Sequence, residues 1–271
     1  MSYKKSVFIG RKSFLASCFQ ERYASNATTF LDARDPELPI KLKNADVVVN
    51  FAFDPKLSKL KYDQRLDIDA HLASLLKGTA TRYVTFSTRC VYSADASTPA
   101  IETETGGEVG VYGTNKRIIE NRLIDTLGDR LLILRLSNIV GYEFGRARRT
   151  FMAMMQDSLR EESRVYFNQP LSTRKDFLPA PLFADALDRF VQADVCGVYN
   201  LGSGIPLPCG DVIASLLEKH SGADVVLADR QLPAEEFWLS MEKSSHIIEY
   251  LPTSADILLY IKTLGERLLN D

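Results

Sequence analysis

The sequence predicts an α/β fold: a Rossmann-like, doubly wound parallel sheet with a smaller mixed lobe toward the C-terminus. Short apolar runs alternate with helix-like stretches through the first half of the chain, which is typical of βαβ units. The run ADVVVNFAF at 45–53 is apolar on both faces, as a strand inside a parallel sheet requires. With 271 residues, the chain is long enough to bury a full hydrophobic core.

The elements of the first half follow one another in regular order. Residues 57–77 carry leucines broadly on one stripe, which predicts a helix that packs on one face. The expected strands are 5–10, 28–32, 45–53, 82–87 and 131–136, and the expected helices are 13–23, 57–77 and 113–127.

The alternation becomes less regular after residue 140. We expect a strand at 197–201 and helices at 148–160, 182–192, 209–220 and 253–269. The second half is therefore expected to add a smaller lobe of mixed structure.

The charge balance argues against a nucleic acid partner. The chain has 33 basic and 35 acidic residues, a net charge of −2, and without a basic surplus there is no general attraction for phosphate backbones. One local basic cluster, Arg146, Arg148 and Arg149, is better interpreted as the solvated start of a helix than as a phosphate site.

The apolar runs and the cysteines exclude other classes of protein. No run approaches the ~20 apolar residues of a membrane span, and the run at 7–9 is too short for a signal peptide. We therefore expect no membrane partner. The four cysteines and three histidines lack metal-site spacing, so no metal is predicted, and unpaired cysteines suit a reducing cytoplasm.

The turn after the first strand has the position of a pyrophosphate-binding turn. A strand that leads through a tight turn into a helix N-terminus offers backbone N–H groups to an anion. The pattern expected for such a turn is Gly-x-x-Gly-x-x-Gly; only Gly10 is present, and Ser13 and Ala16 are small substitutes. An ordinary strand-to-helix turn remains the alternative.

Asp32 ends the second strand, 22 residues after Gly10. A carboxylate at this position accepts hydrogen bonds from ribose hydroxyls, which favours NAD. Arg11 and Arg34 are near enough in sequence to attract a 2′-phosphate, so NADP stays possible. Only 14 residues separate Asp32 from Val47, and we expect the adenine side of the pocket to be abbreviated.

A tyrosine, a lysine and a threonine form the candidate catalytic set. Tyr112 and Lys116 are four residues apart at a helix start, so they share one face. A tyrosine with an ordinary pKa of ~10 needs a neighbouring ammonium to act as an acid or base near neutrality. Thr88 ends the strand 82–87, at the sheet edge where doubly wound folds bind ligands, and its hydroxyl is expected to hydrogen-bond a substrate oxygen.

These motifs, in this order, resemble the extended short-chain dehydrogenase/reductase family, the NAD-dependent epimerase/dehydratase group. The resemblance covers nearly the whole chain. It rests on DVVVNFA in the third expected strand, FSTRCVY around Thr88, ETE at 102–104, YGTNK at Tyr112, LRLSNIVG at 134–141, STRKDFL at 172–178 and GVYNLGSG at 197–204.

The resemblance implies the two halves of a site. Asn138 matches an asparagine that usually contacts substrate, and Arg174 or Lys175 matches an arginine that approaches the nucleotide diphosphate; we assign Arg174. The implied cofactor residues are Gly10, Arg11, Ser13, Phe14, Leu15, Asp32, Arg34, Phe51, Ala52, Tyr112 and Lys116, and the implied substrate residues are Thr88, Cys90, Asn138 and Arg174.

The residues after Thr88 depart from two branches of the family. The 4,6-dehydratases carry Asp-Glu there, and this chain has Arg89 and Cys90, which disfavours dehydration. Epimerase-reductases pair a cysteine at the place of Cys90 with a histidine. Because this chain has no histidine near the matching position, we interpret Cys90 as a small buried side chain of the substrate site.

The resemblance implies a cytoplasmic NAD(P)-dependent enzyme that acts on a nucleotide-diphosphate sugar. The short chain favours reduction of a 4-keto sugar, and epimerisation at the 4-position by the same residues is the alternative. A non-catalytic dinucleotide sensor is a further alternative, because the glycine motif is degraded. The expected dinucleotide-binding domain is 1–140 with 178–201, and the expected substrate lobe is 141–177 and 202–271. A homodimer through the helices at 57–77 and 113–127 is possible by the same resemblance.

Overall fold

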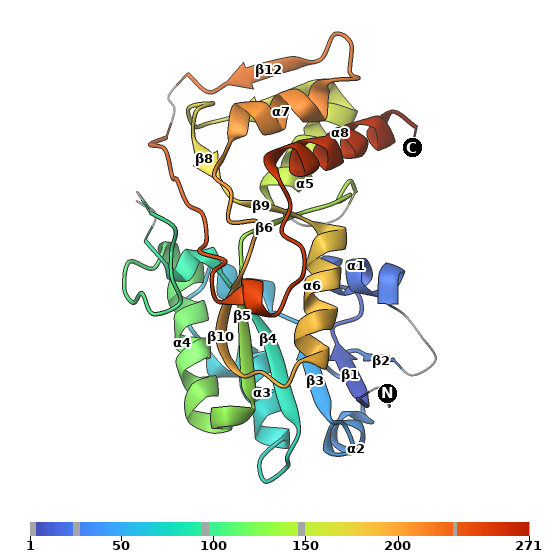
Figure 1. The fold of residues 1–271 in the computed structure, drawn as a ribbon, viewed down its shortest axis with the longest axis vertical. Coiled ribbons are helices and arrows are strands. Elements are labelled where there is room, and N and C mark those ends of the chain that lie inside the picture. Colours follow the sequence, from blue (N-terminus) through green and yellow to red (C-terminus); the bar gives the residue numbers. More distant parts are fainter. Residues whose placement is uncertain (1–3, 24–27, 94–97, 146–149, 230–231, 271) are drawn as a thin grey trace.

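A computed structural model describes residues 4–23, 28–93, 98–145, 150–229 and 232–270 (Figure 1). The basic cluster of Arg146, Arg148 and Arg149 lies outside the described residues. Among the described residues, no helix combines the length and the apolar character needed to cross a membrane.

A six-stranded parallel sheet is the centre of the larger half, which confirms the predicted α/β class. Its strand order is β10-β5-β4-β3-β1-β2, and every neighbouring pair is parallel. The strands are β1 Ser6–Ile9, β2 Thr29–Leu31, β3 Val47–Asn50, β4 Arg82–Thr88, β5 Leu131–Leu136 and β10 Gly197–Leu201.

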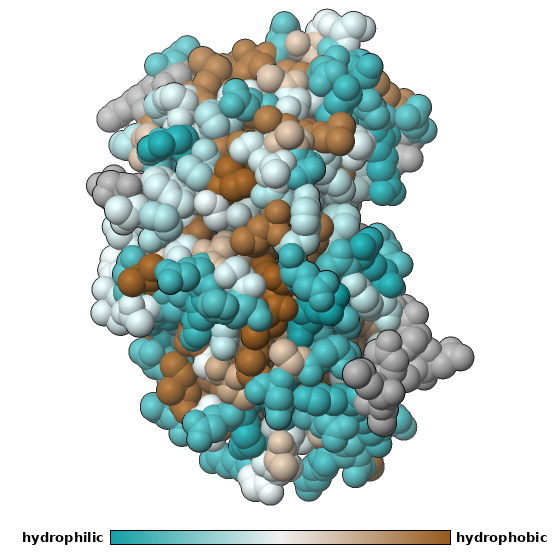
Figure 2. Space-filling view, viewed as in Figure 1, coloured by the Kyte–Doolittle hydropathy of each residue, from teal (hydrophilic) through white to brown (hydrophobic). Residues whose placement is uncertain are grey.

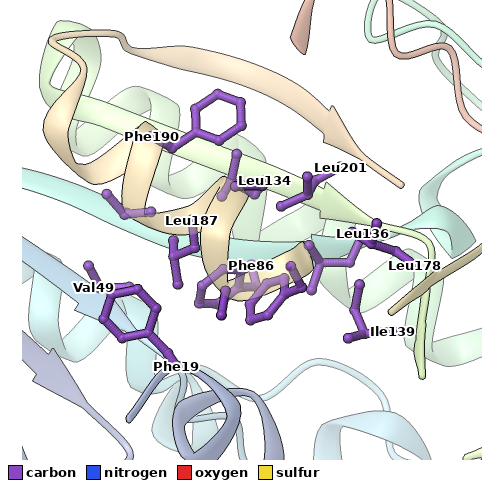
Figure 3. Close-up of a cluster of buried hydrophobic side chains, with 14 of the residues drawn as sticks. Phe19, Val49, Phe86, Leu134, Leu136, Ile139, Leu178, Leu187, Phe190 and Leu201 are labelled. Carbon is purple, nitrogen blue, oxygen red and sulfur yellow. The ribbon is translucent and has the colours of Figure 1, made fainter. Parts of the chain in front are cut away.

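Helices cover both faces of this sheet. The helices are α1 Phe14–Tyr23, α2 Leu38–Lys43, α3 Ile68–Leu75, α4 Gly110–Leu127 and α6 Ala180–Gln192. Successive side chains of a strand point to opposite faces, so Val47 and Val49 pack toward α1 and α6 and Val48 packs toward α2, α3 and α4. Figure 3 shows the first of these cores, where Phe86 and Leu134 of the sheet meet Leu187 and Phe190.

The helix expected at 57–77 is wrong in its first half. Short 3-10 turns occupy Pro55–Ser58 and Gln64–Leu66, and the α-helix begins only at Ile68. The carboxylates of Asp54, Asp63 and Asp67 accept the backbone N–H groups of Lys56, Arg65 and Ala70. These local hydrogen bonds start new turns and so compete with one continuous helix.

The edge of the sheet at β2 is abbreviated, and the reduced adenine side of a cofactor pocket stays a prediction. Between β2 and β3 the chain forms only the six-residue α2, and β2 is a three-residue edge strand. The 14 residues available hold one short helix and no additional strand.

The smaller lobe has its own hydrophobic core, which α5, α7 and α8 supply together with β7. Figure 1 shows these elements stacked beyond the carboxyl ends of the sheet strands. The lobe elements are β6 Asn138–Val140, α5 Phe151–Glu162, β7 Arg164–Phe167, β8 Arg174–Lys175, β9 Phe177–Pro179, β11 Leu207–Pro208, α7 Cys209–Leu217, β12 Asp224–Leu227 and α8 Ser254–Asn270. Hydrophilic residues cover much of the face of the molecule seen in Figure 2, with hydrophobic residues in small groups between them. The division into a cofactor domain and a substrate lobe stays a prediction.

Candidate active site

The structure places Thr88 and Lys116 at one end of the sheet. Thr88 is the last residue of β4 and is buried, and its hydroxyl oxygen accepts the Cys90 N–H at 3.2 Å. Lys116 is on α4, and its ammonium donates to the carbonyl oxygen of Phe86 in β4 at 2.8 Å. Since Phe86 and Thr88 lie two residues apart on one strand, the ammonium is bound near the end of β4 that carries Thr88.

Phe53, which was not among the predicted site residues, contacts both Tyr112 and Lys116. The ring of Phe53 packs edge-on against Tyr112, with 5.6 Å between ring centroids, and the ammonium of Lys116 lies 4.4 Å from the centre of the same ring. Phe53 follows the end of β3. It therefore links the loop after β3 to the first turn of α4 and fixes how Tyr112 and Lys116 are presented.

Gly113 allows α4 to approach the residues that follow Thr88. A Cβ at Gly113 would lie 2.1 Å from the carbonyl oxygen of Cys90, which is closer than any side chain permits. The same carbonyl accepts the N–H of Val109 at 2.8 Å, immediately before α4. The first turn of the helix thus rests directly on the backbone after Thr88, and this contact brings Tyr112 to the strand end.

Gly113→Ala is expected to displace this first turn. We expect a stability loss of about 1–3 kcal/mol from overpacking. A shift of about 1 Å between catalytic groups would lower turnover by up to ~100-fold. Denaturant midpoints and steady-state kinetics measure the two effects, and Val111→Ala, an exposed change in the same turn, is the control. Unchanged stability and turnover would show that the helix does not depend on the contact.

The charge of Lys116 depends on buried carboxylates. Burial lowers the pKa of Lys116, and Asp69, Glu120 and Asp67 act in the opposite direction. Asp69 is the largest of these opposing influences, and it is buried on α3. Its carboxylate accepts hydrogen bonds from three side chains of neighbouring strands: Asn50 at 2.8 Å, Tyr83 at 2.7 Å and Thr85 at 2.7 Å.

Asp69 also orders the loop that carries Phe53. Asn50, which donates to Asp69, donates to the Ala52 carbonyl at 3.1 Å and accepts the Ala52 N–H at 2.9 Å. Asp69 was not among the predicted site residues, because nothing in the local sequence distinguishes it from a solvated helix residue.

Asp69→Asn is expected to change the pH dependence of the reaction. The substitution removes a negative charge that favours the ammonium, so the pKa of Lys116 falls further. Lys116 then loses its proton at lower pH, and the alkaline limb of the kcat/KM profile moves to lower pH. Asp63→Asn, at a carboxylate paired with Arg65 on the surface, is the matched control. A profile that coincides with the wild type would exclude Asp69 as a charge partner of Lys116.

The turn after β1 is built for close approach of backbone groups. Gly10 has φ of +89°, and a Cβ there would lie 2.7 Å from the Ala52 nitrogen. Ser13 caps α1: its hydroxyl accepts the Ala16 N–H at 3.1 Å. The ring of Phe14 is buried against Gly141, so Phe14 belongs to the core, while Leu15 beside it is half-buried. These residues fit a dinucleotide turn, with one helix N–H already satisfied by Ser13.

Asp32 follows β2 and forms an ion pair with Arg11, with 3.1 Å between Nη2 and Oδ2. Both side chains are about half exposed, and Arg34 is exposed. This ion pair links Asp32, whose carboxylate would accept hydrogen bonds from a ribose, to Arg11 in the turn after β1. Phe51 and Ala52, the other predicted cofactor residues, lie beside this turn, and Phe51 is buried in the core.

The predicted substrate residues differ in their contacts and in how far they are exposed. The amide nitrogen of Asn138 donates to the Asp176 carbonyl at 3.1 Å and so connects β6 to β9. Cys90, expected to be buried, is partly exposed, and it lies in the short 3-10 turn Arg89–Val91 that follows β4. Arg174 is exposed and ion-paired with Glu236 at 2.9 Å, whereas Lys175, its neighbour, is buried.

The buried carboxylate of Asp176, between β8 and β9, holds neighbouring loops together. Asp176 accepts the backbone N–H groups of Ser203 at 2.8 Å, Gly204 at 3.1 Å and Leu239 at 3.1 Å, together with the Ser203 hydroxyl at 2.8 Å. A Cβ at Gly202 would lie 2.6 Å from the same carboxylate. Two segments distant in sequence, residues 202–204 and the chain at Leu239, therefore converge on Asp176. Within the motif RKDF at 174–177 the predicted site residue was a basic one, whereas the acidic residue makes these contacts.

Comparison with known proteins adds family and fold. A model of the NAD dependent epimerase/dehydratase family matches residues 10–202. No curated protein matches the chain significantly.

Several solved structures share the fold at low sequence identity. UDP-N-acetylglucosamine 4-epimerase from Methanobrevibacter ruminantium M1, solved with UDP-N-acetylmuramic acid, is 18% identical with a TM-score of 0.82 over 100% of this chain and 99% of that one. The NAD-dependent NDP-hexosamine 5,6-dehydratase TunA is 18% identical with a TM-score of 0.80 over 99% and 98%. UDP-glucuronic acid 4-epimerase from Bacillus cereus, solved with UDP-glucuronic acid and NAD, is 17% identical with a TM-score of 0.75 over 96% and 99%.

Proposed function

The chain belongs to the NAD dependent epimerase/dehydratase family, and from that premise we propose that it is an NAD-dependent 4-epimerase of a nucleotide-diphosphate sugar. The observation that carries the proposal is the docking of α4 on β4, which holds Lys116 on the Phe86 carbonyl near the end of β4 that carries Thr88, with Tyr112 on the same helix face. A protein that only sensed a dinucleotide would not need a threonine, a phenol and an ammonium in this arrangement.

The three side chains divide the chemistry. The Thr88 oxygen already accepts the Cys90 N–H, which leaves its proton to donate to the substrate oxygen. Lys116 stabilises the phenolate of Tyr112, which takes the proton from the sugar hydroxyl, and the resulting neutral phenol then returns that proton to the carbonyl oxygen. Bound NAD would supply the hydride acceptor, and the protein contributes position and charge.

NAD rather than NADP suits the residues around the ribose. The Asp32 carboxylate accepts hydrogen bonds from ribose hydroxyls and repels a 2′-phosphate. Arg11, which would attract that phosphate, is engaged by Asp32. We propose that Gly10, Ser13, Phe14 and Leu15 hold the pyrophosphate through backbone groups of the turn.

Chain length does not separate epimerisation from ketoreduction, and we prefer epimerisation because two of the structures that share the fold are 4-epimerases of nucleotide sugars. The chain spans 99% of the length of an epimerase structure from Methanobrevibacter ruminantium M1, so it is not short for that reaction. Dehydration is disfavoured, because Arg89 cannot act as the acid that elimination needs. Ketoreduction uses the same three residues and is the second candidate. A homodimer remains a prediction.

The two reactions differ in their use of the cofactor. We expect the NAD-loaded protein to interconvert the C4 epimers of a UDP- or dTDP-linked sugar, seen by NMR, without net formation of NADH. Net consumption of added NADH with a 4-keto sugar would instead show a reductase. Binding of NAD without turnover of any nucleotide sugar would favour a sensor and contradict the proposal.

A further inference from the structure

A buried ion pair binds the middle of α4 to the sheet. The guanidinium of Arg135, on β5, donates from Nε to one carboxylate oxygen of Glu120 at 3.1 Å and from Nη2 to the other at 2.8 Å. Both side chains are only 3% exposed. Because the guanidinium is planar and binds both carboxylate oxygens, the pair fixes a direction as well as a distance between α4 and β5.

Stability alone does not explain charges at this place. Arg135 interrupts the apolar run LLILRL of β5, and the side chains next to it on the α4 face of that strand, such as Ile133, belong to the hydrophobic core. Removing two charges from water is costly, and apolar residues of similar volume often stabilise a fold equally well or better. This leaves geometric specificity as the explanation to test.

The position of Glu120 on α4 relates that geometry to the site. Tyr112, Lys116 and Glu120 are four residues apart, so they lie broadly along one face of the helix at successive turns. Glu120 is about 6 Å along the helix axis from Lys116 and about 12 Å from Tyr112. Lys116 is already bound to the Phe86 carbonyl on β4. A second contact one turn later, on β5, therefore fixes how far α4 extends along the sheet.

Hydrogen bonds connect the ion pair to the segment that follows Thr88. The hydroxyl of Tyr92 accepts Nη1 of Arg135 at 2.9 Å and donates to the amide oxygen of Asn200, on β10, at 2.6 Å. Glu102 completes a ring of bonds: its backbone carbonyl accepts Nη1 of Arg135 at 3.0 Å, and its carboxylate accepts the Asn200 N–H at 2.8 Å. Tyr92 and Asn200 are buried, so water has little access to these bonds.

Arg117 connects the same part of α4 to that segment a second time. Its guanidinium donates to the Val91 carbonyl at 2.8 Å and to the Glu120 carboxylate at 3.1 Å. The bonds thus lead from α4 through β5 to β10 and back to the residues just after Thr88. We call the connected side chains the Arg135 network; they are Tyr92, Glu102, Arg117, Glu120, Arg135 and Asn200.

We propose that the Arg135 network is a positioning device for catalysis, which sets the place of α4 along the sheet and so the place of the Tyr112 phenol and the Lys116 ammonium relative to Thr88. Arg135 and Glu120 act through these groups and are not catalytic residues themselves. The inference rests on the proposed function, because it concerns how that site is held in its working arrangement.

Arg135→Lys tests the geometry, because it keeps the charge opposite Glu120 and removes the planar fork. We expect kcat of the C4 epimerisation to fall about 10- to 100-fold, the effect of a displacement of about 1 Å between reacting groups, while affinity for NAD changes little. Tyr92→Phe deletes one oxygen of the network and should lower kcat in the same direction. Arg189→Lys, at an exposed arginine paired with Glu249, is the matched control and should leave kcat unchanged.

A double-mutant cycle separates positioning from a general loss of structure. If Arg135 acts through the tyrosine, Arg135→Lys should lower the residual kcat of a Tyr112→Phe protein by a much smaller factor than it lowers that of the wild type. An equal fractional loss in both backgrounds would show that Arg135 serves the fold alone, and would overturn the inference. If Arg135→Lys does not fold, Tyr92→Phe takes its place in the cycle.

Hydrogen exchange gives a result that does not depend on turnover. In Arg135→Lys we expect the amides of residues 113–118 on α4 to exchange about 10-fold faster, the effect of weakening one hydrogen bond between charged groups, while the amides of α6 change much less. An equal change in both helices, or none in α4, would overturn the inference. A wild type that turns over no nucleotide sugar would defeat the proposed function, and faster exchange confined to α4 would then still support the network.

Discussion

Replacing Tyr112 by phenylalanine is expected to lower kcat by about 10²- to 10⁴-fold, the usual contribution of a positioned acid or base. The variant retains the ring that packs on Phe53, so the first turn of α4 should keep its place. Only the phenolic oxygen is lost, and with it the group that exchanges a proton with the sugar hydroxyl. Affinity for NAD should stay within about threefold.

Turnover and NAD binding are measured on the same preparation, by NMR of the sugar epimers and by titration calorimetry. Tyr166→Phe is the matched control, because Tyr166 is exposed on β7 and its hydroxyl donates to Glu162 at the end of α5. Turnover of Tyr112→Phe near the wild-type rate would remove the tyrosine from the chemistry.

Asp176→Asn is expected to cost the most stability of any single change to the site, about 3 kcal/mol or more. The carboxylate receives three backbone N–H groups and one hydroxyl. An asparagine nitrogen would face N–H donors, and each buried donor that loses its acceptor costs about 1–3 kcal/mol. The segments around Ser203 and Leu239 should loosen together, and affinity for the nucleotide sugar should fall with them.

Urea unfolding followed by circular dichroism measures this loss. Asp224→Asn, an exposed position on β12, provides a control that should stay within about 0.5 kcal/mol of the wild type. An unfolding midpoint of Asp176→Asn equal to that of the control would mean that the loops around Asp176 are held by other contacts.

The fold was predictable because its strands are short apolar runs between helical segments. The strand at 197–201 lies where it was expected, and the shortage of residues between Asp32 and Val47 correctly indicated a reduced sheet edge. The error at 57–77 has a local cause, since aspartates that cap short turns look like ordinary polar residues of a helix. Leucine periodicity alone does not reveal such interruptions.

The candidate site was only partly predictable. We could predict that Thr88 and Lys116 lie near each other, because Thr88 was expected at the end of a strand and Lys116 near the start of a helix. In doubly wound folds, ligands bind at the carboxyl ends of the strands. Phe53 and Asp69 act through contacts between segments distant in sequence, which no local motif encodes. The choice between Arg174 and Lys175 depended on which side of β8 faces inward, and a two-residue strand gives too little pattern to decide it.

The most direct test of the account is a crystal structure of the protein with NAD bound. We expect the Thr88 hydroxyl, the Tyr112 phenol and the Lys116 ammonium to surround the nicotinamide end, with the reacting groups about 3–3.5 Å from the position of the sugar carbon. A structure in which the dinucleotide binds elsewhere, or in which these three groups stay apart with NAD present, would contradict it.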